Sequence, residues 1–338
     1  MKLIGNGDTQ RQIFVAAQSA KKMNMPIPHM LLAGAAGCGK TSMAKCVARL
    51  TSGSFVSIFP ESLKKMDDIV DLFDRLDYTN YNEIGDQTGK IKPTIIFIDE
   101  IHNLKPLQIQ EWLGVAMENF ELYVDNRRYW LPHFTMVGAT TNDGLLSKPF
   151  LDRFKMRFIF RPYNFKESTQ IVIVHAERLN IAIMLNAAEA IAQRGRGVPR
   201  ILVGYLERCR DTAYVHGTKL ITKKIVEETF NLLGVDKEGL RETELRLMKA
   251  LYEAGTPVGI ENLSIITNEA PKTIANAIEP FLIQKGFMIR SGQGRLLTKA
   301  GKEYLEATGF FNSKKTRRQA LPPGYTRRLT HANPDETR

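Results

Sequence analysis

Residues 34–41 restrict the folds open to this chain more than any other stretch of its sequence. They read Gly-Ala-Ala-Gly-Cys-Gly-Lys-Thr, the G-x-x-x-x-G-K-T pattern of a phosphate-binding loop. An apolar run at residues 30–33 precedes the loop, and a helical pattern at residues 42–50 follows it. A strand, such a loop and a helix in this order are typical of a P-loop α/β domain, whereas a glycine-rich turn without a ligand requires no such context.

The loop supplies the groups that bind nucleotide phosphates. Its glycines let consecutive backbone N–H groups surround the phosphates, and the helix behind it adds the positive end of its dipole. We expect Lys40 to reach the β- and γ-phosphates and the Thr41 hydroxyl to bind Mg²⁺. The residues predicted to bind the nucleotide from this loop are Gly34, Gly37, Cys38, Gly39, Lys40, Thr41 and Ser42.

A second stretch indicates hydrolysis of the nucleotide. The run Thr94–Ile98 is typical of a strand buried on both faces, and Asp99 and Glu100 follow it directly. At the carboxyl end of a strand beside the loop, Asp99 can hold Mg²⁺ through water, and Glu100 can polarise the attacking water. Alone, the two carboxylates could simply end a strand, but the phosphate-binding loop upstream favours the catalytic interpretation.

Composition excludes some classes of protein. No run of about eighteen apolar residues is present, so we expect no membrane span, and the start of the chain lacks the pattern of a secretory signal. Cys38, Cys46 and Cys209 show neither metal-ligand spacing nor the even number of a disulfide framework, which favours a reducing cytoplasm. The formal net charge is +11, and more than half of it lies from Leu240 onward. This excess favours a polyanionic partner such as nucleic acid, with general solubility as the alternative.

The chain divides into four segments by pattern. Residues 1–160 alternate short apolar strands with helical stretches, which predicts a doubly wound parallel α/β domain. Residues 161–235 show helical stretches without a strand signal, which predicts a small helical domain. Residues 240–310 form a compact mixed unit, and residues 311–338 are predicted to be a disordered basic tail. The basic residues noted in this tail are Lys314, Lys315, Arg317, Arg318, Arg327 and Arg328.

The third segment has the element order of a winged helix. Three helical patterns, at residues 242–254, 261–267 and 271–284, precede two short strands that flank a glycine-rich tip carrying an arginine. Arg290 and Arg295 are the predicted DNA-binding residues, in contact with phosphates or the minor groove. The third helix has few polar residues, so base-specific readout is not expected. A winged helix that binds protein is the alternative.

These motifs together resemble the RuvB family, the ring-forming AAA+ motors of bacterial Holliday-junction branch migration. The resemblance covers nearly the whole chain, from about Leu3 to Phe310, in the same domain order. Residues 95–104, Ile-Ile-Phe-Ile-Asp-Glu-Ile-His-Asn-Leu, are very close to the family's Walker B region. The other matching stretches are the sensor 1 stretch at 138–141, the arginine-finger stretch at 145–154, the sensor 2 motif at 197–200 and the DNA-contacting wing at 294–295.

The resemblance implies an AAA+ ATPase that uses ATP and Mg²⁺, with a helical lid and a C-terminal winged helix. Thr141 would orient the attacking water or sense the γ-phosphate. Arg200 in the lid would follow the γ-phosphate, because a guanidinium on a hinged domain can convert hydrolysis into rotation. Arg153 would enter a neighbouring subunit's site as an arginine finger. The catalytic set is therefore Lys40, Asp99, Glu100, Thr141, Arg153 and Arg200, with Thr41 and Asp99 as metal ligands.

The resemblance also implies how the adenine is bound. Residues 3–5 are similar to the stretch whose backbone groups contact the base, so Ile4 and Gly5 are the residues assigned to it. Tyr163 either packs near the same base from the lid side or packs only at a domain interface.

The activity implied is that of an ATP-dependent DNA motor, a helicase or translocase on duplex DNA that drives Holliday-junction branch migration in recombination and repair. The expected partners are DNA, further copies of the chain in a hexameric ring, and a RuvA-like junction-binding protein. Residues 120–134 are shorter than the family's partner-binding hairpin, which argues against a standard RuvA. Tyr129 and Trp130 either replace this contact or belong to the core. An AAA+ domain followed by a winged helix also describes loader and initiator ATPases, which assemble on DNA without translocating.

Overall fold

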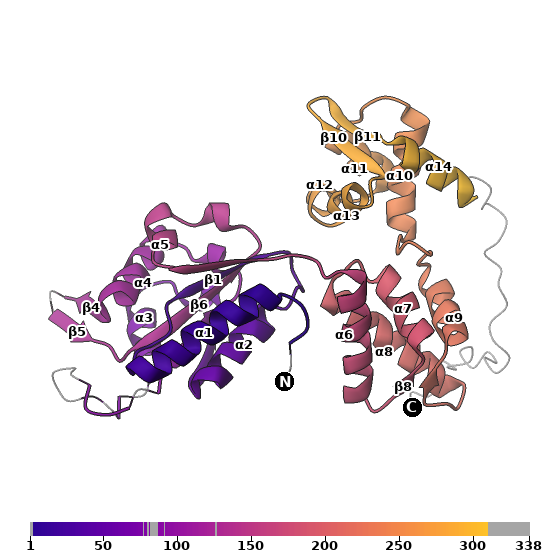
Figure 1. The fold of residues 1–338 in the computed structure, drawn as a ribbon. Helices are drawn as coiled ribbons and strands as arrows, with labels where there is room; N and C mark the ends of the chain where they lie inside the picture. Colours follow the sequence, from indigo (N-terminus) through magenta and orange to yellow (C-terminus); the bar gives the residue numbers. More distant parts are fainter. Residues whose placement is uncertain are drawn as a thin grey trace, which may run out of the picture. The chain divides into compact units, whose positions relative to one another are not determined.

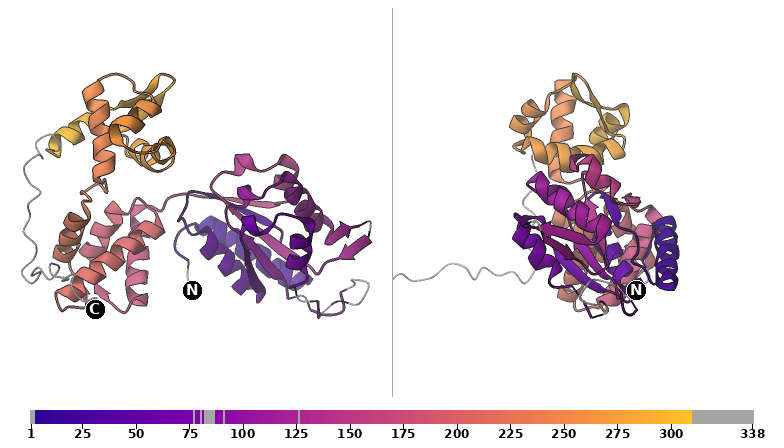
Figure 2. Two further views of the ribbon diagram at one scale, coloured as in Figure 1. Left: turned by 180° about the vertical axis from the view of Figure 1, so that it is seen from behind. Right: turned by 90° about the vertical axis from the view of Figure 1, so that its left-hand side faces the viewer.

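The structure is a computed structural model, and it describes residues 3–76, 78, 79, 81, 87–90, 92–125 and 127–309. The basic tail at residues 311–338, for which disorder is predicted, lies outside the described residues. The chain forms two compact units, Met1–Gly239 and Leu240–Arg338, and each is described by itself. The first unit contains the α/β domain and a group of helices, and the second is a smaller mixed unit (Figures 1 and 2).

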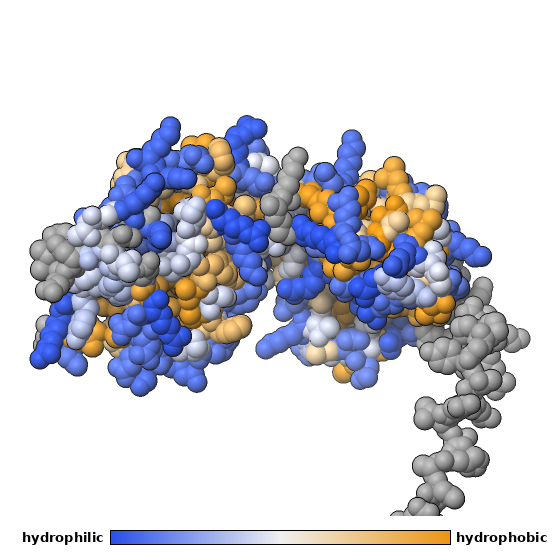
Figure 3. All heavy atoms as spheres, turned by 90° about the horizontal axis from the view of Figure 1, so that it is seen from below, coloured by the Kyte–Doolittle hydropathy of each residue, from blue (hydrophilic) through white to orange (hydrophobic). Residues whose placement is uncertain are grey.

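The face of the protein drawn in Figure 3 is mostly hydrophilic, with apolar patches between the charged residues. Several large apolar side chains are exposed, among them Phe14, Val15 and Met23 of helix α1, Gly7–Met23. Single exposed apolar residues are common on soluble folds, whereas patches mark surfaces of contact. None of the described helices combines the length and the apolar character that crossing a membrane requires.

A parallel sheet organises the first unit. Among the described residues it has five strands in the order β2-β3-β6-β1-β7. The strands are β1 Met30–Gly34, β2 Ser54–Ile58, β3 Thr94–Ile98, β6 Phe134–Thr140 and β7 Met156–Phe160. Strand β6 pairs with β3 on one side and with β1 on the other, all in parallel. The loop after β1 and the residues after β3 and β6 therefore meet at one edge, which is where α/β sheets bind ligands.

Helices cover both faces of this sheet, because successive side chains of a buried strand point to opposite faces. In β3, Ile96 and Ile98 belong to one apolar cluster, and Ile95 and Phe97 belong to another. The second cluster includes residues of α1 and of α2, Lys40–Thr51. The helices of the first cluster are α3 Met66–Phe73, α4 Leu107–Asn119 and α5 Lys148–Asp152.

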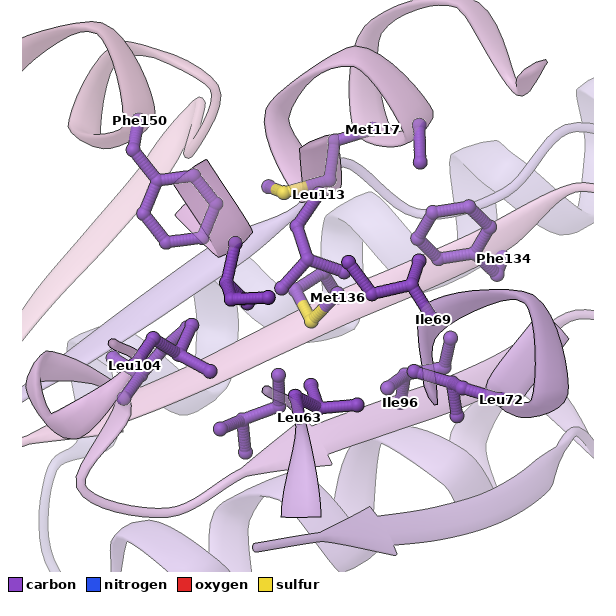
Figure 4. Packing of buried hydrophobic residues seen from close by; sticks show 14 of the residues in the cluster. Leu63, Ile69, Leu72, Ile96, Leu104, Leu113, Met117, Phe134, Met136 and Phe150 are labelled. Atoms are coloured by element: carbon purple, nitrogen blue, oxygen red, sulfur yellow. The ribbon is translucent and has the colours of Figure 1, made fainter. Parts of the chain in front are cut away.

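Figure 4 shows the first cluster from close by. Ile69 of α3, Leu113 and Met117 of α4 and Phe150 of α5 gather around Met136 of β6. This packing fixes β3 and β6 side by side and so fixes the residues that follow them. The predicted doubly wound parallel α/β fold is confirmed.

The rest of the first unit is largely helical and has its own apolar core. Its helices are α6 Phe165–Arg178, α7 Leu185–Arg194, α8 Pro199–Val215 and α9 Lys223–Leu233. The expectation that this segment contains no strand is wrong, since β8 Ala182–Ile183 pairs in parallel with β9 Leu220–Ile221. Strands of two residues are too short to produce a periodic pattern in the sequence.

The second unit has the predicted winged-helix order around one apolar core. Helices α10 Glu242–Ala254 and α11 Ile260–Thr267 come first. The helix predicted over 271–284 is divided into α12 Pro271–Thr273, a π-helical turn η4 Ile274–Ile278 and α13 Glu279–Gln284. Pro280 lacks the N–H of a regular helical bond, and wider turns of this kind accommodate such a defect. Strands β10 Met288–Ser291 and β11 Gly294–Leu297 form the wing, and α14 Lys299–Ala307 follows.

Candidate functional site

The loop after β1 has the backbone of an anion cradle. Gly34, Gly37 and Gly39 all have positive φ angles, at 142°, 80° and 92°, which side chains other than glycine rarely adopt. A Cβ atom added to Gly34 would lie 2.3 Å from the carbonyl oxygen of Phe160. The loop ends at Gly39, which begins α2, so the free N–H groups of that helix face the same space. Cys38 is fully buried in the loop, and burial raises the pKa of its thiol.

Lys40 lies inside this loop and is only 5% exposed. Its Nζ donates hydrogen bonds to the carbonyl oxygens of Gly34 at 2.6 Å and Ala35 at 3.0 Å. Burial lowers the pKa of the ammonium, and the carboxylates of Glu100 and Asp99 oppose this shift. A buried cation held by neutral carbonyl groups is well suited to bind an anion.

A cavity of about 700 Å³ lies over the loop. Side chains from several parts of the first unit line it, among them Lys40 and Thr41 from α2, Asp99 and Glu100 after β3, His175 from α6 and Arg200 from α8. Gly37, Gly39 and Ser42 line it as well. The structure thus brings together most of the residues that the sequence analysis assigned to phosphate binding and hydrolysis.

The residues at this cavity fit a magnesium ion bound beside phosphates. Thr41 and Asp99 supply one hydroxyl and one carboxylate to the same space. Magnesium commonly uses one or two protein oxygens together with phosphate oxygens and water. The described part of the chain contains no group of three or more His, Cys, Asp or Glu side chains arranged for a metal. This set of oxygen atoms therefore suits Mg²⁺ held jointly with a nucleotide.

Glu100 is held by contacts from the neighbouring strand. Its Oε2 accepts hydrogen bonds from the Thr141 hydroxyl at 2.8 Å and from the Thr141 N–H at 3.2 Å. Its backbone has a φ of 46°, which is strained for a residue with a side chain. Thr141 is not among the described residues that line the cavity, and it is joined to the cavity through its hydrogen bonds to Glu100.

A second, smaller cavity of about 80 Å³ adjoins the loop. The residues predicted to contact adenine, Ile4, Gly5 and Tyr163, all line it. Gly39 and Ser42, predicted from the loop, line it too, but the sequence analysis missed the residues of α6, whose signal was only a helical periodicity. These are Ile171, Val174, His175 and Arg178, which lie on one face of that helix.

Tyr163 lines this smaller cavity and also joins three segments of the first unit. Its hydroxyl donates to the carbonyl oxygen of Cys38 and accepts from Asn6 Nδ2, both at 3.3 Å. A Cβ added to Gly5 would lie 2.6 Å from its ring. Burial raises the pKa of its phenol group. The ring therefore packs between segments and also faces the smaller cavity, so the contact with the base stays a prediction.

Arg200 owes its place to the turn before α8. Tyr163 N–H donates to the carbonyl oxygen of Gly197 at 2.8 Å. Gly197 has a φ of 65°, and a Cβ there would lie 2.4 Å from the Tyr163 carbonyl oxygen. Pro199 begins α8, so Arg200 projects from the first turn of the helix toward Gly37.

Arg153 lies elsewhere. It follows α5, and it is not among the described residues that line the cavity around Lys40. Its Nη2 lies 2.6 Å from Glu118 Oε2 on α4, and both side chains are partly exposed.

The prediction that Arg295 lies at the tip of the wing is wrong. A two-residue turn, Gly292 and Gln293, joins the strands, so Arg295 falls inside β11 and is 7% exposed. Its Nε lies 2.6 Å from Glu279 Oε1, and its Nη2 lies 3.3 Å from Oε2. The guanidinium thus forms a buried ion pair with Glu279, and its assignment to DNA binding stays a prediction. Arg290, opposite Arg295 in the strand register, is exposed.

The short hairpin consists of β4 Glu121–Val124 and β5 Arg127–Trp130. Trp130 packs against Tyr78 and Tyr81, with ring centroids 5.2 and 5.9 Å apart. Tyr129, in contrast, is 46% exposed. Of the two alternatives, partner contact or core, Trp130 fits the core, because it is part of a packed aromatic cluster. Tyr129 fits a contact surface, because it is exposed.

Three family models match consecutive segments of the chain. Residues 1–159 match the model described as the Holliday junction DNA helicase RuvB P-loop domain. Residues 163–236 match the RuvB AAA lid domain, and residues 237–306 match the RuvB C-terminal winged helix domain. The three models follow one another along the chain in the same order as the α/β domain, the helical segment and the winged helix of the structure.

Relatives and solved structures agree with these models. A relative from Fervidobacterium nodosum, the Holliday junction branch migration complex subunit RuvB, is 35% identical over 312 residues, which cover 89% of this chain and 86% of the relative. The fold is similar to that of the RuvB Holliday junction branch migration motor from Thermotoga maritima, with a TM-score of 0.75 and 32% identity over 90% of this chain and 95% of that chain. A single-residue variant of the same motor gives a TM-score of 0.77 at 31% identity, with coverage of 90% and 95%. With its phosphate-binding loop, lid and winged helix in this order, the chain belongs to the RuvB family.

Proposed function

We propose that this protein is an ATP-driven DNA motor that moves along duplex DNA and drives branch migration of four-way junctions in recombination and repair. The observation that carries the proposal is the meeting of Lys40, Thr41, Asp99, Glu100 and Arg200 around one cavity. Family membership supports the DNA substrate, because the similar proteins are named for Holliday-junction branch migration.

In this mechanism the loop and Lys40 bind the triphosphate, and Arg200 contacts its γ-phosphate from the lid. Mg²⁺, held by Thr41 and Asp99, would neutralise charge on the phosphate oxygens. Glu100 takes a proton from a water molecule whose oxygen bonds to the γ-phosphorus. The bond between that phosphorus and the oxygen bridging to the β-phosphate breaks, and its electron pair leaves with ADP. Backbone groups of Ile4 and Gly5 bind the adenine in the smaller cavity.

The position of Arg153, away from the cavity around Lys40, supports a ring arrangement. A guanidinium that lies outside its own cavity can complete the cavity of a neighbour, where it stabilises charge in the transition state. The exposed apolar residues of α1 favour contact with further copies of the chain. We therefore infer a homo-oligomer, a hexamer in the family's arrangement, with the active sites between subunits.

The winged helix supplies the contact with DNA. Exposed cations on its surface include Arg290 of the wing and Lys272 of α12. Such residues bind phosphates without reading the base sequence, so the affinity should fall steeply with salt. On the α/β domain, exposed Tyr129 offers a site for a junction-binding partner of the RuvA kind.

The experiment that tests this function uses a synthetic four-way junction. We expect the wild-type protein with ATP to dissociate the junction into duplex arms, and the Glu100→Gln variant to bind the junction without dissociating it. A non-hydrolysable ATP analogue should give the same result as the variant. If the wild-type protein assembles on the junction with ATP but never dissociates it, with or without a RuvA protein, the loader or initiator alternative is correct.

A further inference from the structure

His102 is a side chain that the proposed mechanism leaves unused, although it lies beside the carboxylate of Glu100. It belongs to the short turn η2, Ile101–Asn103, directly after the acidic pair. Its Nδ1 lies 3.3 Å from Glu100 Oε2 and 2.9 Å from the hydroxyl oxygen of Thr140. The imidazole is largely enclosed, with 14% of its side chain exposed.

The partners of Nδ1 determine where the ring carries its proton. An ionised carboxylate can only accept hydrogen bonds, whereas the Thr140 hydroxyl, which accepts one from Asn142 N–H at 2.9 Å, can still donate or accept another, so Glu100 decides the tautomer. If Nδ1 were unprotonated, its lone pair would face the negative oxygen of Glu100. The arrangement therefore favours the tautomer in which Nδ1 carries the proton, hydrogen-bonded to Thr140 Oγ1 and 3.3 Å from Glu100 Oε2, which it attracts electrostatically.

This contact adds to those that Thr141 makes with the same atom. Glu100 Oε2 thus faces the Thr141 hydroxyl, the Thr141 N–H and His102 Nδ1, all at 3.3 Å or less. Among the described residues, Oε1 of the same carboxylate has no comparable donor. One oxygen is anchored to the end of β6, and the other is left to take the proton of the attacking water.

We propose that His102 is a positioning residue of the ATPase, which holds the Glu100 carboxylate in the orientation that hydrolysis requires. The inference rests on the proposed function. The left-handed backbone of Glu100 is strained, and such a conformation persists only where the surrounding structure holds it, which is consistent with a carboxylate supported from two sides. Thr141 anchors the carboxylate from one strand, and His102 anchors it from its own segment.

The test compares three substitutions at this position. His102→Asn places an amide N–H near the position of Nδ1, whereas His102→Gln places it near that of Nε2, and His102→Ala removes the donor. We expect His102→Ala and His102→Gln to lower kcat for ATP hydrolysis by about tenfold, a fraction of what a complete general base contributes. His102→Asn should retain kcat within about threefold. The KM for ATP should stay within about twofold in all three, because the contact concerns only the carboxylate.

Two matched measurements separate this role from folding. His216→Ala removes another histidine that contacts a glutamate, Glu228, but on the exposed surface of the lid, and should leave kcat unchanged. Calorimetric titration with ADP should give the same affinity for His102→Ala as for the wild-type protein. Rescue by asparagine and not by glutamine would support the proposal even if His102→Ala does not fold.

The proposal is overturned if His102→Ala hydrolyses ATP at the wild-type rate, or if His102→Asn is impaired as much as His102→Gln. Glu100→Gln is measured beside them so that the two proposals can be told apart. Should Glu100→Gln itself hydrolyse ATP at the wild-type rate, the assignment of Glu100 as the catalytic base fails, and the proposed mechanism fails with it.

Discussion

Lys40 and Arg295 are both cations in nearly buried positions, but their charges are compensated differently. Lys40 Nζ is bonded to two neutral carbonyl oxygens, so an anion that enters the cavity gains its full attraction. Arg295 already shares a bidentate contact with the Glu279 carboxylate. At the scale of single residues, therefore, the charge of Lys40 is placed to bind a ligand, whereas the charge of Arg295 is placed to stabilise the winged-helix fold.

The first prediction concerns the Arg295–Glu279 pair. Removing one partner of a buried ion pair leaves the other charge without compensation, which costs roughly 3–5 kcal/mol. We expect Arg295→Ala to lower the free energy of unfolding of the winged-helix unit by about this amount in urea denaturation. Arg290→Ala, an exposed change on the facing strand, should leave that free energy unaltered while weakening DNA binding. Equal stability of Arg295→Ala and the wild-type protein would show that the pair contributes nothing to the fold.

At the scale of elements, the turn before α8 connects the lid to the linker that carries Tyr163. We predict that Gly197→Ala lowers ATPase activity by at least about tenfold. The added Cβ would collide with the Tyr163 carbonyl oxygen and displace Arg200. A displacement of about 1 Å of a catalytic group is enough to cause a loss of this size. Gly7→Ala, at the start of α1 where a Cβ meets nothing, is the matched control. Phosphate release under saturating ATP measures both variants, and wild-type turnover by Gly197→Ala would rule out this role for the turn.

The helices and strands that could be predicted from the sequence are those long enough to show an apolar run or a helical period within their own residues. Strand β3 is apolar because both of its faces are covered, and α10 repeats its apolar residues at helical spacing. Strands β8 and β9 are too short for a pattern, and the π-helical turn at residues 274–278 is a local departure inside a helix whose overall period is correct.

The candidate site was predictable where a motif carries the ligand groups, as in the loop and the acidic pair. The residues of α6 at the smaller cavity and the partners of Glu100 depend on tertiary contacts. No local pattern states that Thr141 meets Glu100, 41 residues earlier in the chain. The burial of Arg295 depends on the hairpin turn having two residues, which the glycine-rich sequence left open.

At the scale of the whole molecule, the prediction concerns cooperation between copies. Lys40→Ala subunits lack a functional cavity, and Arg153→Ala subunits cannot complete a neighbour's, so each pure variant should lose ATPase activity by roughly 10³-fold. In an equal mixture, about a quarter of the interfaces join an intact cavity to an intact Arg153, as follows from random assembly of a closed ring. We therefore expect the mixture to recover about a quarter of the wild-type ATPase rate. Full activity in pure Arg153→Ala protein would instead place the whole reaction within one subunit.

The three contacts of Tyr163 have a consequence for the timing of the reaction cycle. The Tyr163 hydroxyl contacts Asn6 and the carbonyl of Cys38 in the loop, while the Tyr163 backbone, in the linker before α6, bonds to Gly197 of the lid. In the proposed mechanism, a rotation of the lid would therefore disturb the binding of the base and the shape of the loop at the same moment. Release of ADP and rotation of the lid would then be a single event. Force applied to the DNA would therefore change the rate at which ADP is exchanged for ATP.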